Sequence, residues 1–131
     1  MKYLYCAVLH REDSGLYSVE FPDFTPEAAT CGDDLKDALH MAKDVLEGYL
    51  TYKEDNHQKI NPASDPAKIK VDDGDILTVV NIDTNLVRAR DQSKLVKKTV
   101  TIPSYLNEYG MSEGINFSKI LTNALKDLLK V

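Results

Sequence analysis

Apolar and polar positions follow two different periods in the first part of the chain. Residues 2–10 form a near-continuous apolar run, whereas residues 16–21 alternate between apolar and polar side chains. The first pattern is typical of a strand buried on both faces, and the second of a strand with one open face. Gly15 lies in the turn between them, where a hairpin requires a positive φ. We therefore predict a central strand paired with a second strand, a break at residues 22–26 and a short third strand over residues 28–31.

The clearest helical pattern of the chain follows these strands. Its apolar side chains recur every three or four residues and form one stripe, made of Leu35, Ala38, Leu39, Ala42, Val45, Leu46, Tyr49 and Leu50. Asp34 is a suitable N-cap, so the helix is predicted from Leu35 to about Tyr52. Residues 53–66 are polar and indicate a loop, and residues 76–82 indicate a fourth strand. The predicted body is a β-β-β-α-β layer with one helix on one sheet face, an α+β fold. We expect Tyr3, Tyr5 and Tyr17 on the opposite face.

The last third of the chain changes pattern again. Residues 84–95 indicate a polar connector that is helical in part, and residues 97–103 alternate as a strand does, up to Pro103. Two helices are predicted after it. The first is capped by Ser104, runs over residues 105–109 and stops at Gly110; the second is capped by Asn116 or Ser118. Because about 35 residues rarely bury enough apolar surface to fold alone, we expect two copies to pair their strands and share a core.

The 131-residue chain has a net charge of −5, and its acidic and basic residues are distributed unevenly along it. Residues 1–87 carry 8 Lys and Arg against 17 Asp and Glu, whereas residues 88–131 carry 8 against 4. The acidic body suits a basic protein partner, and the basic tail can approach phosphates. No apolar run has the length of a membrane span, and the N-terminus has no signal-peptide pattern. Cys6 and Cys31 lack metal or redox spacing, so we expect reduced thiols in a cytoplasmic protein.

Clustered carboxylates raise the question of catalysis. The candidates are Glu12, Asp13, Glu20, Asp23, Asp33 and Asp34. Two-metal catalysis needs carboxylates that converge on metals about 4 Å apart, but most of these residues are explained by turns or by a helix cap. His10, His40 and His57 show no ligand spacing. We therefore expect no catalytic residue, metal or cofactor, and we expect Glu20 and Asp23, which flank a Phe-Pro-Asp turn, to contact a partner.

The tail is similar to the ribbon-helix-helix DNA-binding module in the order and length of its elements. Thr99 and Thr101 hydroxyls can bond to base edges and Lys97 can reach guanine, whereas Lys98 is better placed for a phosphate. Residues at the start of the second helix, which are expected to meet phosphate, are Asn116, Phe117, Ser118 and Lys119. The alternatives are a solvent-exposed strand face without a ligand and a plain capping segment.

A second resemblance covers the body. The stretch Tyr-Ser-Val-Glu-Phe-Pro-Asp at residues 17–23, Gly-Asp-Asp-Leu at residues 32–35 and the Ala-Leu-rich helix after it resemble the HicB family of antitoxins. That family has a degraded RNase H-like body and often a C-terminal DNA-binding module. The chain departs from it at residues 24–28, where the family has a Pro-Gly-Cys-type segment.

The resemblance implies an organisation and a function. Residues 1–84 would bind a HicA-type mRNA-cleaving toxin through Glu20, Asp23 and Phe24. Residues 85–96 would be a linker, and residues 97–131 would dimerise and bind operator DNA to repress the chain's own operon, with higher assemblies when toxin is bound. Two other functions stay open: a stand-alone regulator with a ligand-sensing body, and a residual RNase H-like nuclease.

Overall fold

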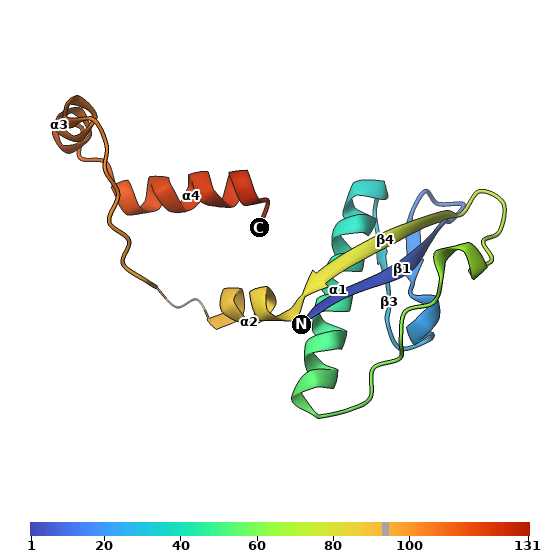
Figure 1. Ribbon diagram of the computed structural model, residues 1–131. Helices are drawn as coiled ribbons and strands as arrows, with labels where there is room; N and C mark the ends of the chain where they lie inside the picture. Colours follow the sequence, from blue (N-terminus) through green and yellow to red (C-terminus); the bar gives the residue numbers. More distant parts are fainter. Residues whose placement is uncertain (93–94) are drawn as a thin grey trace. The chain divides into compact units, whose positions relative to one another are not determined.

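The computed structural model describes residues 1–92 and 95–131 and divides the chain into two compact units, Met1–Lys94 and Leu95–Val131 (Figure 1). The first unit is a mixed α+β layer. Its strands are β1 (Lys2–Arg11), β2 (Tyr17–Glu20), β3 (Ala29–Gly32) and β4 (Ile76–Asp83). Within the described residues they form one antiparallel sheet in the order β3-β2-β1-β4. The long apolar run thus lies in a central strand, as predicted, because β1 pairs on both sides.

One long helix, α1 (Leu35–Asp55), covers a face of this sheet (Figure 1). Asp34 caps it as predicted, since its Oδ1 accepts a hydrogen bond of 2.8 Å from the Asp37 backbone N–H. The predicted stripe of α1 supplies the helical half of the core and the strands supply the other half. The largest fully buried apolar side chains are Phe21, Leu9, Leu46, Leu50 and Ile82.

The three N-terminal tyrosines lie on the α1 side of the sheet, so their expected placement on the opposite face is wrong. The Tyr5 ring packs 4.5 Å from Phe24, and the Tyr3 hydroxyl donates a 2.7 Å hydrogen bond to Glu54 of α1. Tyr17 packs against the same core. The even-numbered positions of β1 face the other way, where the connection between α1 and β4 lies beside Val8.

The segment after β4 is a helix, α2 (Thr84–Gln92), that belongs to the first unit. Val87 is buried, Arg88 pairs with Glu54 at 3.0 Å and with Asp55 at 2.6 Å, and Arg90 pairs with Glu47 at 2.9 Å. The linker expected at residues 85–96 is therefore corrected: most of it docks on α1 through these ion pairs. Residues 93 and 94, which the expected linker includes, lie outside the described residues.

The second unit contains α3 (Ser104–Ser112) and α4 (Phe117–Leu129). Gly110 does not stop α3, because it lies inside the helix and is buried beneath the ring of Phe117. The chain turns instead at Gly114, whose φ is +66°. Ser104 is the first helical residue rather than the cap, whereas Asn116 caps α4 as predicted by accepting a 3.0 Å bond from the Lys119 N–H.

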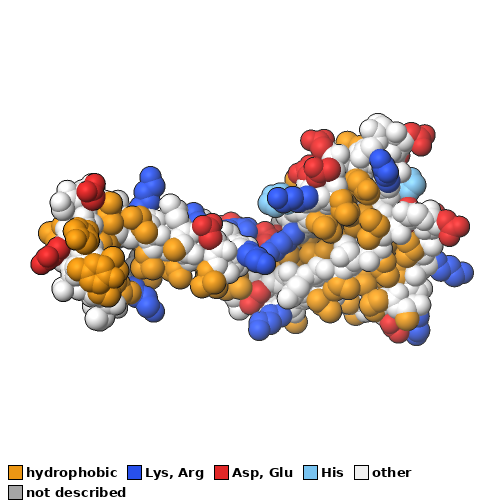
Figure 2. Space-filling model, turned by 90° about the horizontal axis from the view of Figure 1, so that it is seen from above, with side chains coloured by type: hydrophobic (Ala, Val, Ile, Leu, Met, Phe, Trp, Pro, Cys, Tyr) orange, Lys and Arg blue, Asp and Glu red, His pale blue; other side chains and the backbone are white. Residues whose placement is uncertain are grey.

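Residues 97–103 form no strand in this chain, contrary to the expectation for this segment. The physical reason is that a strand needs a hydrogen-bonded neighbour, and the described part of this single chain offers none to the segment. Among the described residues of the second unit only Gly110 is buried. Figure 2 shows the result, a band of hydrophobic side chains open on the surface of this unit. None of the described helices combines the length and apolarity needed to cross a membrane.

Candidate functional site

The Phe-Pro-Asp turn folds into a short 3-10 helix, Pro22–Phe24, directly after β2. Three partner contacts are expected here, and the structure places them in three different environments. Glu20 is exposed, and no described residue pairs with its carboxylate. Phe24 is 3% exposed and packs between Tyr5 and Tyr49 at ring-centroid distances of 4.5 and 4.7 Å. Phe24 is therefore a core residue, and the expected surface contact through it is corrected.

Asp23 joins this turn to the long connection after α1. Its carboxylate accepts a 3.0 Å hydrogen bond from the Ser64 N–H and a second bond from the Ser64 hydroxyl. Its backbone carbonyl accepts a 3.0 Å bond from the Asn61 side-chain amide. The Tyr5 hydroxyl donates to the Asn61 carbonyl from the core. Asp23 thus fixes where residues 61–64 lie, a positioning task that its turn context alone did not indicate.

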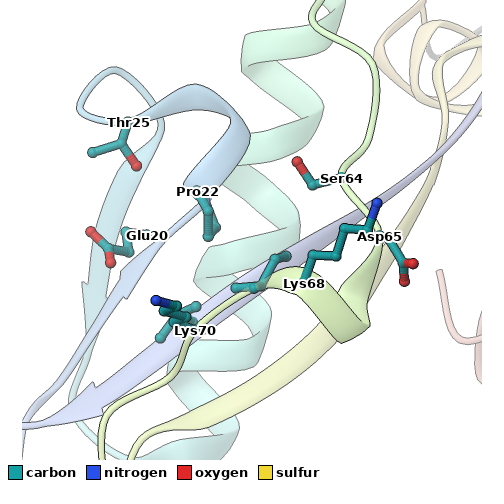
Figure 3. Close-up of a pocket in the computed structure, with 9 residues that line it drawn as sticks. Glu20, Pro22, Thr25, Ser64, Asp65, Lys68 and Lys70 are labelled. Atoms are coloured by element: carbon teal, nitrogen blue, oxygen red, sulfur yellow. The ribbon is translucent and has the colours of Figure 1, made fainter.

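A shallow groove of about 640 Å³ lies between the turn and this connection (Figure 3). The turn side contributes Glu20, Pro22 and Thr25, and the connection contributes Ser64, Asp65, Lys68, Ile69 and Lys70. In Figure 3 Glu20 lies on one wall and Lys68 and Lys70 on the facing segment. An open surface with charges of both signs suits a protein partner better than a small apolar ligand, which favours enclosed apolar walls.

Sequence reasoning missed the wall that the connection contributes. Asn61-Pro62 and Asp65-Pro66 correctly indicated a loop. The 3-10 helix Pro66–Lys68, capped by a 3.0 Å bond from the Ala67 N–H to Asp65, then orients the two lysines. Nothing in that composition indicated that the loop returns to β2, because the tie is the long-range bond between Asp23 and Ser64.

The other carboxylates singled out in the sequence are dispersed. Asp34 caps α1, and Asp37 accepts a 2.9 Å bond from the Asp33 N–H. Across residues 1–92 and 95–131 no three His, Cys, Asp or Glu side chains are grouped so that they could hold a metal. His10 pairs with Asp75 at 2.5 Å, and this hydrogen bond raises the pKa of its imidazole.

The eight expected DNA contacts fall into two groups within the second unit. Lys97, Lys98, Thr99 and Thr101 are exposed in the segment that leads into α3. Asn116, Phe117, Ser118 and Lys119 open α4, where the Asn116 side-chain oxygen is occupied by the cap and the Phe117 ring covers Gly110. Asn116 and Phe117 therefore have structural tasks already, whereas no described residue hydrogen-bonds or ion-pairs with the side chains of the first group.

The apolar stripe of α4 is open to solvent along its length. The side chains of Ile120, Leu121 and Leu125 are 51, 38 and 45% exposed, and Leu128 and Leu129 are more exposed still. An amphipathic helix with its apolar face uncovered is incomplete as a single chain. The second unit carries 5 Lys against 3 Asp and Glu, so its net charge is positive. Its described apolar side chains form no buried core.

Comparison with known proteins adds independent information. A family model described as HicB-like antitoxin of bacterial toxin-antitoxin system matches residues 5–121. A chain of a toxin-antitoxin complex from Streptococcus pneumoniae is 26% identical, with 97% of this chain and 99% of that one covered and a TM-score of 0.58. The antitoxin HicB of Burkholderia pseudomallei is 19% identical, with 97 and 98% covered and a TM-score of 0.57. A chain of a HicA3 and HicB3 toxin-antitoxin complex is 22% identical, with 62 and 99% covered and a TM-score of 0.50. No curated protein matches the chain.

Proposed function

The chain belongs to the HicB-like antitoxin family, and we propose that it neutralises a HicA-type RNA-cleaving toxin and represses its own operon as a dimer bound to operator DNA. One observation carries the proposal: charge and burial are divided between the two units. The first unit has a closed core and carries 11 Lys and Arg against 18 Asp and Glu, whereas the second carries 5 against 3 and lacks a core. The first is thus equipped to bind a basic protein and the second to pair and approach DNA.

Toxin binding is assigned to the acidic first unit, which we infer to be a degenerate RNase H-like domain without catalysis. Its polar groove, with Glu20 on the rim and Asp23 holding the opposite wall, offers a protein-binding surface. An enzyme that binds RNA is positively charged on the surface that contacts the phosphates. An acidic surface docked there competes with RNA by charge as well as by shape.

DNA binding is assigned to a ribbon-helix-helix module completed by a second copy. Two segments at residues 97–103 would pair antiparallel and satisfy each other's backbone groups, and two α4 stripes would share one core. The paired ribbon would present Lys97, Thr99 and Thr101 to the major groove, as β-ribbon readers do. Lys98 and Lys119 would meet phosphates.

The test uses the full chain and the protein encoded by the adjacent reading frame, which we expect to be the toxin. RNA cleavage by that product is measured at rising antitoxin concentration, and binding to the DNA upstream of the chain's own gene is measured by fluorescence anisotropy. We expect cleavage to stop near equimolar antitoxin and the upstream DNA to be bound in preference to scrambled DNA. Cleavage that continues at excess antitoxin would refute the toxin-binding half, and equal binding to both DNAs would refute the repressor half.

A further inference from the structure

The four-stranded sheet of the first unit ends in two very different edges. β3 has four residues and is packed at its end against the start of α1, where Gly32 lies against Ala38. β4 has eight residues and pairs with β1 on one side over its full length (Figure 1). Alternate residues of β4 therefore point their backbone N–H and C=O groups away from the sheet. Among the described residues none outside β1 hydrogen-bonds to these groups.

This edge also lacks the features that normally protect one. Natural sheets blunt a long edge with lysine, proline, a bulge or a covering helix. The β4 sequence Ile-Leu-Thr-Val-Val-Asn-Ile-Asp contains neither lysine nor proline, and its register with β1 runs unbroken from Ile76 to Asp83. A strand of this length and composition is a template for another strand.

Exposed apolar side chains flank the same edge. Val79 is 48% exposed on the sheet face opposite α1, and Leu4 is 58% exposed beside it on β1. Val79 stands opposite Cys6 in the register, so Leu4 is its diagonal neighbour. A strand added to β4 would cover both its open backbone groups and the side chain of Val79.

The charged residues at the ends of β4 indicate which kind of strand would pair with it. Exposed Asp72 and Asp73 precede β4, whereas Asp75 pairs with His10 at 2.5 Å and Asp83, at the end of the strand, lies 3.8 Å from the N-terminal amine. Antiparallel pairing of β4 with a second copy of itself would bring the acidic segment at residues 72–75 of one chain close to Asp83 of the other, and like charges across a ladder are destabilising. A strand flanked by Lys or Arg would instead be attracted by the exposed carboxylates of Asp72 and Asp73. Resting on the proposed function, we propose that β4 receives an edge strand of the toxin, flanked by basic residues, and so extends the sheet by one strand.

Residue-resolved hydrogen exchange tests this directly. The exchange of β4 backbone amides is measured in the full chain alone and with the adjacent-frame product. We expect every second amide between Ile76 and Asp83 to slow by about tenfold or more on binding, because those amides acquire a hydrogen-bond acceptor. The outward amides of β3 serve as the internal control and should not change.

Three results would overturn the inference, and they separate it from the proposed function. Binding with unchanged β4 amides removes the strand addition and leaves the antitoxin role intact. Protection of β4 that grows with the concentration of the free chain assigns the edge to a second copy. The absence of any binding refutes the proposed function together with this inference.

Variants of one exposed position provide a second measurement. Val79→Lys places a positive charge beside the incoming basic strand, and we expect it to weaken toxin binding by about tenfold or more. Val79→Thr, which keeps a β-branched side chain, and Val79→Glu, which adds an attractive charge, should both bind better than Val79→Lys. Unchanged exchange of the β1 amides shows that each variant folds. Equal affinity of the Lys and Glu variants would contradict the proposed charge of the partner strand.

Discussion

A Cβ atom added at Gly32 would lie 2.3 Å from the backbone nitrogen of Ala38. The end of β3 and the first turn of α1 therefore approach each other more closely than any side chain at position 32 permits. The nearest atoms belong to the backbone of Asp37 and Ala38, so the contact can be relieved only if β3 or α1 shifts. This contact explains why Gly stands immediately before the Asp33-Asp34 helix start.

Gly32→Ala should lower the free energy of unfolding by about 2 kcal/mol or more, in the range that overpacking costs. Thermal or urea unfolding of the full chain measures the change. Gly48→Ala is the control, because a Cβ at this exposed position of α1 meets nothing within 4 Å. That variant should stabilise the chain by about 0.5–1 kcal/mol. Equal effects of the two substitutions would contradict the close contact.

Glu54 makes the stability of the first unit sensitive to acid. Burial raises the pKa of this carboxyl, but hydrogen bonds from Tyr3, Arg88 and Thr84 outweigh it and hold the pKa below its ordinary value. A lowered folded-state pKa adds stability that is complete above the unfolded-state pKa of about 4.3 and is lost as the pH falls through the folded-state pKa. Glu54→Gln should therefore flatten the fall of unfolding free energy below about pH 5.

The same experiment has a control on the same helix. Asp44→Asn removes one carboxylate at an exposed position of α1, so it is the charge-matched control for Glu54→Gln. Tyr3→Phe removes the 2.7 Å bond to Glu54 and should cost about 1–2 kcal/mol at neutral pH. A Glu54→Gln profile parallel to the parent would show that the carboxylate contributes nothing to acid unfolding.

Asp23 and Ser64 should act as one unit in toxin binding. If Asp23 serves by holding the groove wall, Ser64→Ala and Asp23→Ala should weaken binding to a similar degree, about tenfold, because either change frees residues 61–64. Isothermal titration with the adjacent-frame product measures this. Ser14→Ala, in the exposed hairpin turn, should bind normally. A loss confined to Asp23→Ala would mean that the Asp23 carboxylate touches the partner itself.

The open stripe of α4 should control self-association of the full chain. Leu125→Asp places a charge in the proposed shared core and should raise the dimer dissociation constant by about a hundredfold or more in sedimentation equilibrium. Asn123→Asp adds the same charge on the polar face of the same helix and should leave the constant nearly unchanged. A Leu125→Asp variant that stays dimeric would place the dimer contact elsewhere.

The segment before α3 should control DNA affinity. Lys97→Ala should reduce the slope of log affinity against log salt by about 1 for each phosphate that the protein no longer neutralises. Thr99→Ala should instead reduce the preference for the upstream DNA over scrambled DNA. Toxin binding should be unchanged in both, and Lys43→Ala on α1 is the charge-matched control. A Lys97→Ala variant with unchanged affinity and slope would exclude this segment from the interface.

Local patterns were sufficient to predict the four strands and the long helix of the first unit. The run at residues 2–10 identified the central strand because both its neighbours bury it, and Asp34 identified the start of α1 because a cap is a local bond. The face occupied by Tyr3 and Tyr5 could not be predicted, since a run that is apolar on both sides carries no alternation to orient it. Periodicity therefore predicted which segments form strands and the long helix, but not which way the tyrosines point.

Features that depend on distant residues were missed or misplaced. The docking of α2 rests on Arg88 and Arg90 reaching acidic residues more than 30 positions earlier in α1, and polar composition alone gives no sign of this. Phe24 looked like part of an exposed turn, but the 3-10 helix turns it into the core between Tyr5 and Tyr49. Gly110 looked like a helix stop, but the ring of Phe117 needs its empty side. The strand expected at residues 97–103 needs a second chain.

The pairing of β1 with β4 has a consequence for the order of events on the ribosome. Lys2 stands opposite Asp83, so β1 gains one of its two neighbours only after some eighty more residues have been made. Contacts so distant in sequence slow folding, and until they form the nascent strand has one edge unsatisfied. Until residues 76–83 have been made, the nascent β1 therefore keeps an edge on which another extended chain could pair.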